Sequence, residues 1–172
     1  SMKNINGIKG LLIDLDGVLY IDDKPIEGAA DTIQSLKDMD VPLRFVTNTT
    51  TRSLESLHRK LREMDFPIDR DEIISAPQAA ILHLRKTGSP RCYLCMNDDL
   101  KKEFSEFEHD EKNPEMVVIG DIDNRWDYPL INRLFRLIVG GADILAVHKG
   151  RFWHKADGLY VDIGVFVAAL EY

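Results

Sequence analysis

Residues 8–15 form a strand-like segment in which apolar side chains follow one another instead of alternating with polar ones. Leu11, Leu12 and Ile13 are consecutive, and Leu15 follows after a single aspartate. A strand with two apolar faces needs cover on both, which is typical of a parallel sheet between layers of helices. Parallel strands are joined by crossovers that are usually helical. The segment therefore predicts an α/β fold with this strand at the centre of its sheet.

The rest of the chain repeats the strand-then-helix order that such a fold requires. A helix start at Ser75, with Pro77 in its first turn, marks the natural boundary. We predict that residues 1–77 form the first part of a core with a parallel sheet and that residues 78–172 form a second α/β domain. Hydrophobic periodicity predicts strands at 43–46, 71–74, 92–96, 116–120 and 144–148, and helices at 29–39, 54–64, 99–107, 128–139 and 165–171.

The charge balance narrows the choice of partners. The chain has 29 acidic and 22 basic residues, a net charge of -7 and a pI near 5.2, which works against binding to nucleic acid or to an anionic membrane. No apolar run approaches the roughly 20 residues of a membrane helix, and the first residues carry no hydrophobic signal segment. We expect a cytoplasmic protein with soluble partners, without nucleic acid or membrane among them.

Cys92 and Cys95 are the only cysteines, and their spacing would suit a redox pair or half of a zinc site. A strand would direct positions three apart to opposite faces, and no second ligand pair exists. Two buried strand cysteines without redox chemistry are the favoured interpretation.

Asp14 and Asp16 lie two positions apart at the end of the first strand. Both side chains should therefore face the crevice where α/β sheets bind ligands. Two neighbouring carboxylates repel one another unless a cation or a proton intervenes. Mg²⁺ is the simplest solution, because it prefers oxygen ligands and commonly takes one or two carboxylates together with substrate phosphate. Gly17 allows the backbone to turn away directly afterwards.

A second polar element, residues 47–50, follows the strand at 43–46 and precedes a helix. A hydroxyl and free backbone amides in this turn would make an anion site. Successive parallel strands place this turn at the same sheet edge as the aspartate pair. Each element alone could be a solvated turn or a helix cap. Together they are stronger evidence for a functional site than either element alone.

The run Asp14-Leu15-Asp16-Gly17-Val18, with the later Thr47-Asn48, resembles motifs I and II of the haloacid dehalogenase (HAD) superfamily of phosphatases. The stretch after residue 76 resembles the larger α/β cap of the NagD-like branch. Residues 44–48 and 166–172 resemble phosphatases of phospholysine, phosphohistidine and inorganic pyrophosphate. The resemblance covers nearly the whole chain and implies a partial, three-layer, Rossmann-like HAD core with a parallel sheet, followed by a cap domain.

The resemblance also implies roles for individual residues. Asp14 would attack phosphorus, form an aspartyl-phosphate and bind Mg²⁺. Asp16 would protonate the leaving group, activate the hydrolytic water and contribute its backbone carbonyl to the metal. Thr47, helped by the amide of Asn48, would bind the transferring phosphoryl group. Tyr20 lies in the stretch that resembles a mobile flap, although apolar packing explains it equally well.

Lys149 and Arg151 follow the predicted strand at 144–148 and could reach an anionic or phosphoamino-acid substrate from the cap. Ordinary surface solvation is the favoured alternative for these two side chains. Asp121 and Asp123 repeat the Asp-x-Asp spelling without the following glycine. We interpret them as a loop or a helix cap.

Two parts of the HAD pattern have no match before Tyr172: a later lysine and an acidic pair on a fourth core strand. The sequence thus looks C-terminally truncated relative to the family. An apolar strand edge would then be open, which favours pairing with another copy as a homo-oligomer. The leading hypothesis is a Mg²⁺-dependent phosphatase of small phosphorylated molecules or phosphoamino acids, incomplete in this chain. The alternative is a non-catalytic, truncated HAD-like protein that binds a partner.

Overall fold

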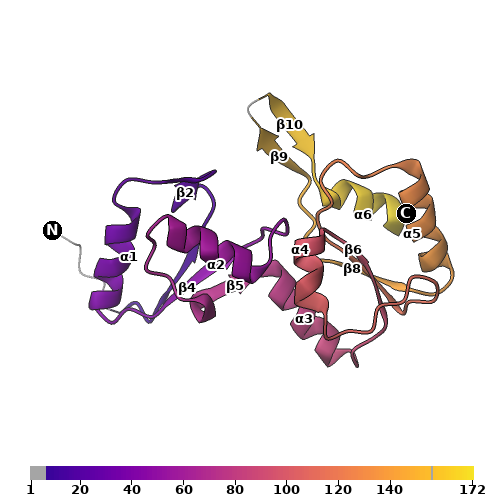
Figure 1. Cartoon of the computed structure of the whole chain (residues 1–172), viewed down its shortest axis with the longest axis horizontal. Coiled ribbons are helices and arrows are strands. Elements are labelled where there is room, and N and C mark those ends of the chain that lie inside the picture. The colour runs from indigo at the N-terminus through magenta and orange to yellow at the C-terminus, as the bar shows by residue number, and fades with distance from the viewer. Residues whose placement is uncertain (1–6, 156) are drawn as a thin grey trace. The chain divides into compact units, whose positions relative to one another are not determined.

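The computed structural model describes residues 7–155 and 157–172, with side chains at all of these except His154 and Lys155. The chain forms two compact units (Figure 1). The first contains the chain up to Thr47 together with Leu54–Ser75, and the second contains Asn48–Ser53 and Ala76–Tyr172. The chain therefore passes from one unit to the other at three points. Whether the first unit is a core and the second a cap stays a prediction.

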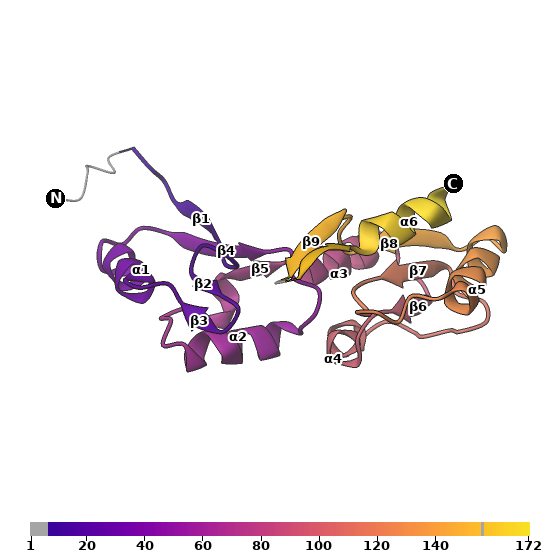
Figure 2. The same cartoon turned by 90° about the horizontal axis from the view of Figure 1, so that it is seen from above.

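The first unit is built on a parallel sheet of three strands in the order β1-β4-β5. The strands are β1 (Leu11–Asp14), β4 (Leu43–Thr47) and β5 (Ile73–Ser75). Helices α1 (Ala29–Asp38) and α2 (Leu54–Glu63) lie on one side of this sheet (Figure 2). A short hairpin, β2 (Tyr20–Ile21) with β3 (Lys24–Pro25), follows β1. The buried cluster between sheet and helices contains Leu15, Ile33, Phe45, Leu57 and Leu61.

The other face of this sheet carries an exposed apolar row. Leu12, Val46 and Ile74 are 75%, 36% and 43% exposed, and the register pairs Leu12 with Arg44, Asp14 with Val46 and Val46 with Ile74. Among the described residues β1 is an edge strand, so the open strand edge expected for this chain is present. The expected cover on both faces of this strand is absent there, because Leu12 and Asp14 are exposed.

The predicted strand at 71–74 begins later than expected. Arg70–Glu72 forms a turn of 3-10 helix, and the strand covers Ile73–Ser75. The turn is stabilised at its start, where the Asp69 N–H donates to Glu72 Oε2 at 2.8 Å. A side chain that satisfies the backbone locally competes with strand pairing, which explains the shift.

The second unit has three layers around the parallel sheet β6-β7-β8 (Figure 2). Its strands are β6 (Cys92–Cys95), β7 (Met116–Ile119) and β8 (Asp143–Ala146). One face packs on α3 (Ala76–Lys86) and α4 (Asp98–Lys101), which continues as the 3-10 helix Lys102–Phe104. The other face packs on α5 (Tyr128–Val139) and α6 (Ile163–Glu171). The α/β class predicted from the sequence is confirmed.

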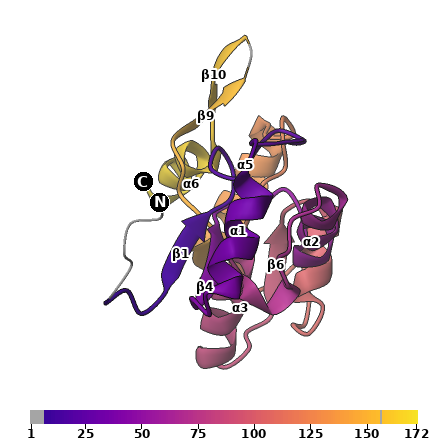
Figure 3. The ribbon, with the colours of Figure 1, turned by 90° about the vertical axis from the view of Figure 1, so that its left-hand side faces the viewer.

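Helix α5 agrees with its prediction in both bounds. Its N-cap, Asp127, accepts the Leu130 N–H at 2.8 Å. The helix ends directly before Gly140 and Gly141, and Gly141 has a φ of 110°. The hairpin of β9 (Phe152–Lys155) and β10 (Gly158–Val161) was not predicted. It projects from the rest of the second unit (Figures 1 and 3). Among the described residues, none of the helices has the length and apolar character needed to cross a membrane.

Candidate active site

The first strand delivers Asp14 to the C-terminal end of the first sheet. Asp14 is the last residue of β1 and lies in register with Val46 of β4. Its carboxylate is exposed, and Oδ1 accepts the backbone N–H of Leu15 at 2.8 Å. Leu15 itself is 0% exposed, so packing of this one leucine fixes the backbone between the two aspartates. Asp16, the next alternate position, is exposed as well, as strand periodicity predicts.

A tight turn after Asp16 reverses the chain. The Gly17 N–H donates to the Tyr20 carbonyl at 2.8 Å, and the Leu19 N–H donates to the Leu15 carbonyl at 2.9 Å. Gly17 has a φ of 76°, and an added Cβ would meet nothing within 4 Å. Glycine is favoured here for its left-handed backbone and not for lack of space. The turn leaves Asp14 and Asp16 at the rim of the sheet, where a ligand could approach.

Tyr20 belongs to the core of the first unit. It is 1% exposed, its ring lies 6.5 Å from that of Phe66, and Lys60 Nζ lies 4.6 Å from its ring centroid. A large buried aromatic with these contacts anchors the turn by packing. Of the two interpretations left open by the sequence, the structure favours packing for Tyr20.

Thr47 also lies where the sequence placed it, at the end of β4. It is 3% exposed and in register with Ser75 of β5, which is 6% exposed. Strand alternation puts Thr47 on the face of Phe45, which is buried, whereas Asp14 shares the exposed face with Val46. The two elements therefore meet at one edge of the sheet but from different faces. A phosphate contact by Thr47 stays a prediction.

The loop Asn48–Ser53 continues from Thr47 but clusters with the second unit. Asn48 is exposed, whereas Thr50 and Ser53 are 2% and 5% exposed. The Ser53 N–H donates to Oδ2 of Asp99 at 2.8 Å. The Asp99 carboxylate thus accepts a hydrogen bond from the last backbone amide before α2.

The donor chemistry of the aspartate pair suits Mg²⁺, which usually takes few protein carboxylates and completes its shell with water and phosphate oxygens. Asp14 and Asp16 supply two exposed carboxylates, one before and one after the buried Leu15. In the part of the chain that the structure describes, no group of three or more His, Cys, Asp or Glu side chains could hold a metal ion. These two residues fit a weakly held ion that depends on substrate for further ligands.

The two predicted cap residues differ in their surroundings. Lys149 Nζ donates to both carboxylate oxygens of Glu171, at 2.9 and 2.7 Å. The carbonyl of Arg151 accepts the Asp162 N–H at 3.1 Å, and its side chain is exposed. The Glu171 carboxylate in α6 partly balances the charge of Lys149. A substrate contact by Lys149 or Arg151 stays a prediction.

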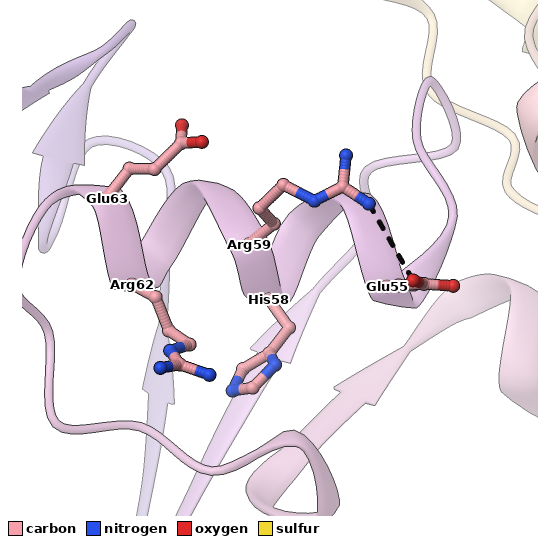
Figure 4. A pocket seen from close by; sticks show the side chains of 5 residues that line it. All are labelled: Glu55, His58, Arg59, Arg62 and Glu63. Atoms are coloured by element: carbon pink, nitrogen blue, oxygen red, sulfur yellow. Dashed lines mark ion pairs between the residues drawn. The ribbon is translucent and has the colours of Figure 1, made fainter.

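Two surface hollows lie in the first unit. One, of about 400 Å³, is lined by five charged or polar side chains of helix α2 alone, with Arg59 3.7 Å from Glu55 (Figure 4). Another, of about 350 Å³, is mostly apolar and borders Ile13 and Val18 on either side of the aspartate run. The α2 hollow comes from a single helix and contains none of the predicted site residues.

Two polar groupings of the second unit escaped sequence analysis. One is the Ser53–Asp99 hydrogen bond, and the other joins His148 and Asp162, whose Nε2 and Oδ1 atoms are 3.8 Å apart. His148 Nδ1 accepts the Gly150 N–H at 3.0 Å. The partners are separated by 46 and 14 residues, so no local spacing rule could have paired them.

Comparisons with known proteins bear on this site. The profile of the haloacid dehalogenase-like hydrolases matches residues 11–109. Mouse haloacid dehalogenase-like hydrolase domain-containing protein 2 is 38% identical over 165 residues, which cover 96% of this chain and 62% of the mouse protein. Zebrafish phospholysine phosphohistidine inorganic pyrophosphate phosphatase is 33% identical over 178 residues, covering 100% of this chain and 65% of that protein.

Solved structures give the same picture. 4-Nitrophenylphosphatase from Thermotoga maritima superposes with a TM-score of 0.85 at 29% identity, over 95% of this chain and 64% of that one. NagD from Escherichia coli K-12 has a TM-score of 0.82 at 21% identity, over 95% and 65%, and this likeness concerns the fold alone. The chain spans 62–65% of the length of the curated relatives. The predicted resemblance to NagD-like phosphatases is confirmed.

Proposed function

Because this chain belongs to the haloacid dehalogenase-like hydrolase family, we propose that it carries the nucleophile and the acid/base of a Mg²⁺-dependent phosphatase. The substrates would be small phosphoric monoesters or phosphoamino acids. The observation that carries the proposal is the exposed pair Asp14 and Asp16 at the C-terminal end of β1, next to the glycine turn. The names of the similar proteins, which include nitrophenyl phosphatases, support the same chemistry.

In the proposed reaction, a carboxylate oxygen of Asp14 attacks phosphorus as the bond to the leaving oxygen breaks. Asp16 gives that oxygen a proton, and the alcohol departs. Asp16, now a base, takes a proton from water as the water oxygen attacks the phosphorus of the aspartyl-phosphate. Phosphate leaves and Asp14 is restored. The exposure of both carboxylates supports these roles, since neither is committed to the core.

Thr47 and the amide of Asn48 would orient the phosphoryl group at the end of β4. Mg²⁺, held by Asp14 and Asp16, would offset the negative charge that gathers between carboxylate and phosphate. We further propose that the apolar row of the first sheet and the open edge of β1 allow two copies to associate.

The test measures Mg²⁺-dependent release of nitrophenol from p-nitrophenyl phosphate by the 172-residue chain. Asp14→Asn should lower kcat by at least about 1,000-fold, because it removes the nucleophile while preserving shape. Asp22→Asn is the matched control: Asp22 is an exposed loop residue with a φ of 54°, which asparagine tolerates. Equal activity of Asp14→Asn and wild type would refute the assignment. Full turnover by the 172-residue wild-type chain would refute the partner-binding alternative.

A further inference from the structure

We propose that Asp99 is a positioning residue that holds the loop Asn48–Ser53 in the conformation needed to bind phosphate. The inference rests on the proposed function, because this loop begins directly after Thr47 and includes Asn48. Neither the sequence pattern nor the family match assigns a role to Asp99.

The loop belongs to one unit and is flanked in sequence by residues of the other. Thr47 and Leu54, on either side of it, belong to the first unit, whereas Asn48–Ser53 cluster with the second. The bond that fixes its C-terminal end is the Ser53 N–H donated to Asp99 Oδ2 at 2.8 Å. A hydrogen bond to an ionised carboxylate is stronger than a neutral one. Asp99 therefore holds the last residue of this loop.

Asp99 is itself fixed in place. Lys102 Nζ lies 3.2 Å from its Oδ1, so that each carboxylate oxygen has a partner, and its side chain is 33% exposed. The adjacent Asp98 differs on both counts: its side chain is 90% exposed and its ion pair is with Lys101, at 3.3 Å. Asp98 and Asp99 thus carry the same charge on the same helix, but only Asp99 is bonded to the loop among the interactions described.

One buried hydroxyl of the loop makes no hydrogen bond among the described residues. Thr50 is 2% exposed, and its hydroxyl has no hydrogen-bond partner among the described residues. A buried hydroxyl without a partner disfavours the conformation that contains it. The Asp99 carboxylate, which accepts the Ser53 N–H, helps to offset this cost.

The same bond also makes one backbone amide, that of Ser53, unavailable to a substrate. Ser53 directly precedes α2, whose N-terminus carries a partial positive charge and attracts anions. Asp99 takes up the Ser53 amide, so this amide is not available to the phosphoryl group that we propose to bind at Thr47 and Asn48. Removal of Asp99 should both loosen the loop and free an amide that competes for phosphate in a second position.

The first measurement is amide hydrogen exchange of the full chain. Asp99→Ala should speed exchange at Ser53 by about tenfold or more, because the bond that protects this amide is lost. Asp98→Ala, the matched control, should leave it unchanged. Asp99→Asn retains an acceptor oxygen and should restore part of the protection. Thermal unfolding of each variant shows whether the fold is intact. Unchanged exchange at Ser53 in Asp99→Ala would overturn the inference.

The second measurement is binding of inorganic phosphate, which does not require turnover. Asp99→Ala should raise the Kd for phosphate, and the KM for p-nitrophenyl phosphate, by about fivefold or more, with kcat changed less than about twofold. Asp99→Asn should lie between Asp99→Ala and wild type, and Asp98→Ala should match wild type.

The outcomes separate this inference from the proposed function. A wild-type chain whose phosphate binding is weakened by Asp99→Ala but which hydrolyses no ester would contradict the proposed function and support the anchoring of the loop. Normal hydrolysis with the same Kd and KM in Asp99→Ala as in wild type would overturn the positioning role alone. If the wild-type chain binds no phosphate, both the positioning role of Asp99 and the proposed function are contradicted.

Discussion

Cys92 and Cys95 lie in one strand, β6, yet they belong to buried clusters on opposite faces of its sheet. Cys92, 0% exposed, packs with Leu84 and Phe104, and Cys95, 5% exposed, packs with Leu134. Burial raises the pKa of each thiol to about 11. The geometry excludes a disulfide between the two, because their side chains are directed away from each other across the sheet.

The two thiols should therefore be inert in the folded protein. At pH 8, iodoacetamide should modify them at least about 100-fold more slowly than in guanidinium, because the thiolate is the reactive form and neither sulfur is accessible. The measurement is intact mass against time, with and without denaturant. Rapid native modification, or a stable intramolecular disulfide, would contradict the packing described.

The role of Asp16 can be tested by the choice of substrate. If Asp16 protonates the leaving oxygen, Asp16→Asn should harm alkyl phosphates more than p-nitrophenyl phosphate, since nitrophenolate leaves with little help from an acid. We expect the ratio of kcat/KM values for the two substrates to shift by about tenfold or more. Steady-state kinetics of wild type and Asp16→Asn with both substrates measures this ratio. An equal loss for both would assign Asp16 to metal binding instead of proton transfer.

The raised pKa of Asp121 should make the stability of the folded protein depend on pH. Burial raises its pKa, and the charges of Asp123 and Asp162 add to the effect, while the Asp123 N–H bonded to its Oδ1 and His148 oppose it. A carboxyl whose folded-state pKa is raised contributes stability below its unfolded pKa and loses it as pH rises through the folded pKa. Asp121→Asn should thus raise the Tm at pH 7 by about 1–3 °C, with the gain shrinking towards pH 4.

Asp110 is the control for Asp121, because its pKa is shifted in the opposite direction. The backbone N–H groups of Asn113 and Lys112 donate to Asp110 and lower its pKa. Its contribution is present above the unfolded pKa and is lost as pH falls through the folded pKa. Asp110→Asn should therefore lower the Tm at pH 7. Thermal unfolding by circular dichroism at several pH values measures both variants, and a lower Tm of Asp121→Asn at pH 7 would contradict the reasoning.

Local patterns were enough to predict much of this fold. The bounds of α5 follow from Asp127 at its start and the glycines at its end, and the two faces of β6 follow from strand periodicity. At the candidate site, the position of Asp14 at a strand end needed only the apolar run before it. These features depend on residues within a few positions of one another.

Features that depend on distant partners could not be predicted. The Ser53–Asp99 bond joins residues 46 apart, and the burial of Thr47 depends on pairing with Ser75 of β5. The β9–β10 hairpin was missed because its exposed aromatic residues do not show the alternation of a half-buried strand. Phe152 and Trp153 are adjacent and 54% and 43% exposed, so both faces of the hairpin are apolar.

The exposed row of Leu12, Val46 and Ile74 has a practical consequence for handling this protein. Such a row offers a binding surface to environment-sensitive dyes, so folded protein should already show enhanced fluorescence with anilinonaphthalene sulfonate. A dye-based melting curve would then start from a high baseline and lose contrast. Emission of Trp126, whose ring stacks on that of Phe166 at 4.3 Å, is the better optical signal for following the unfolding of the second unit.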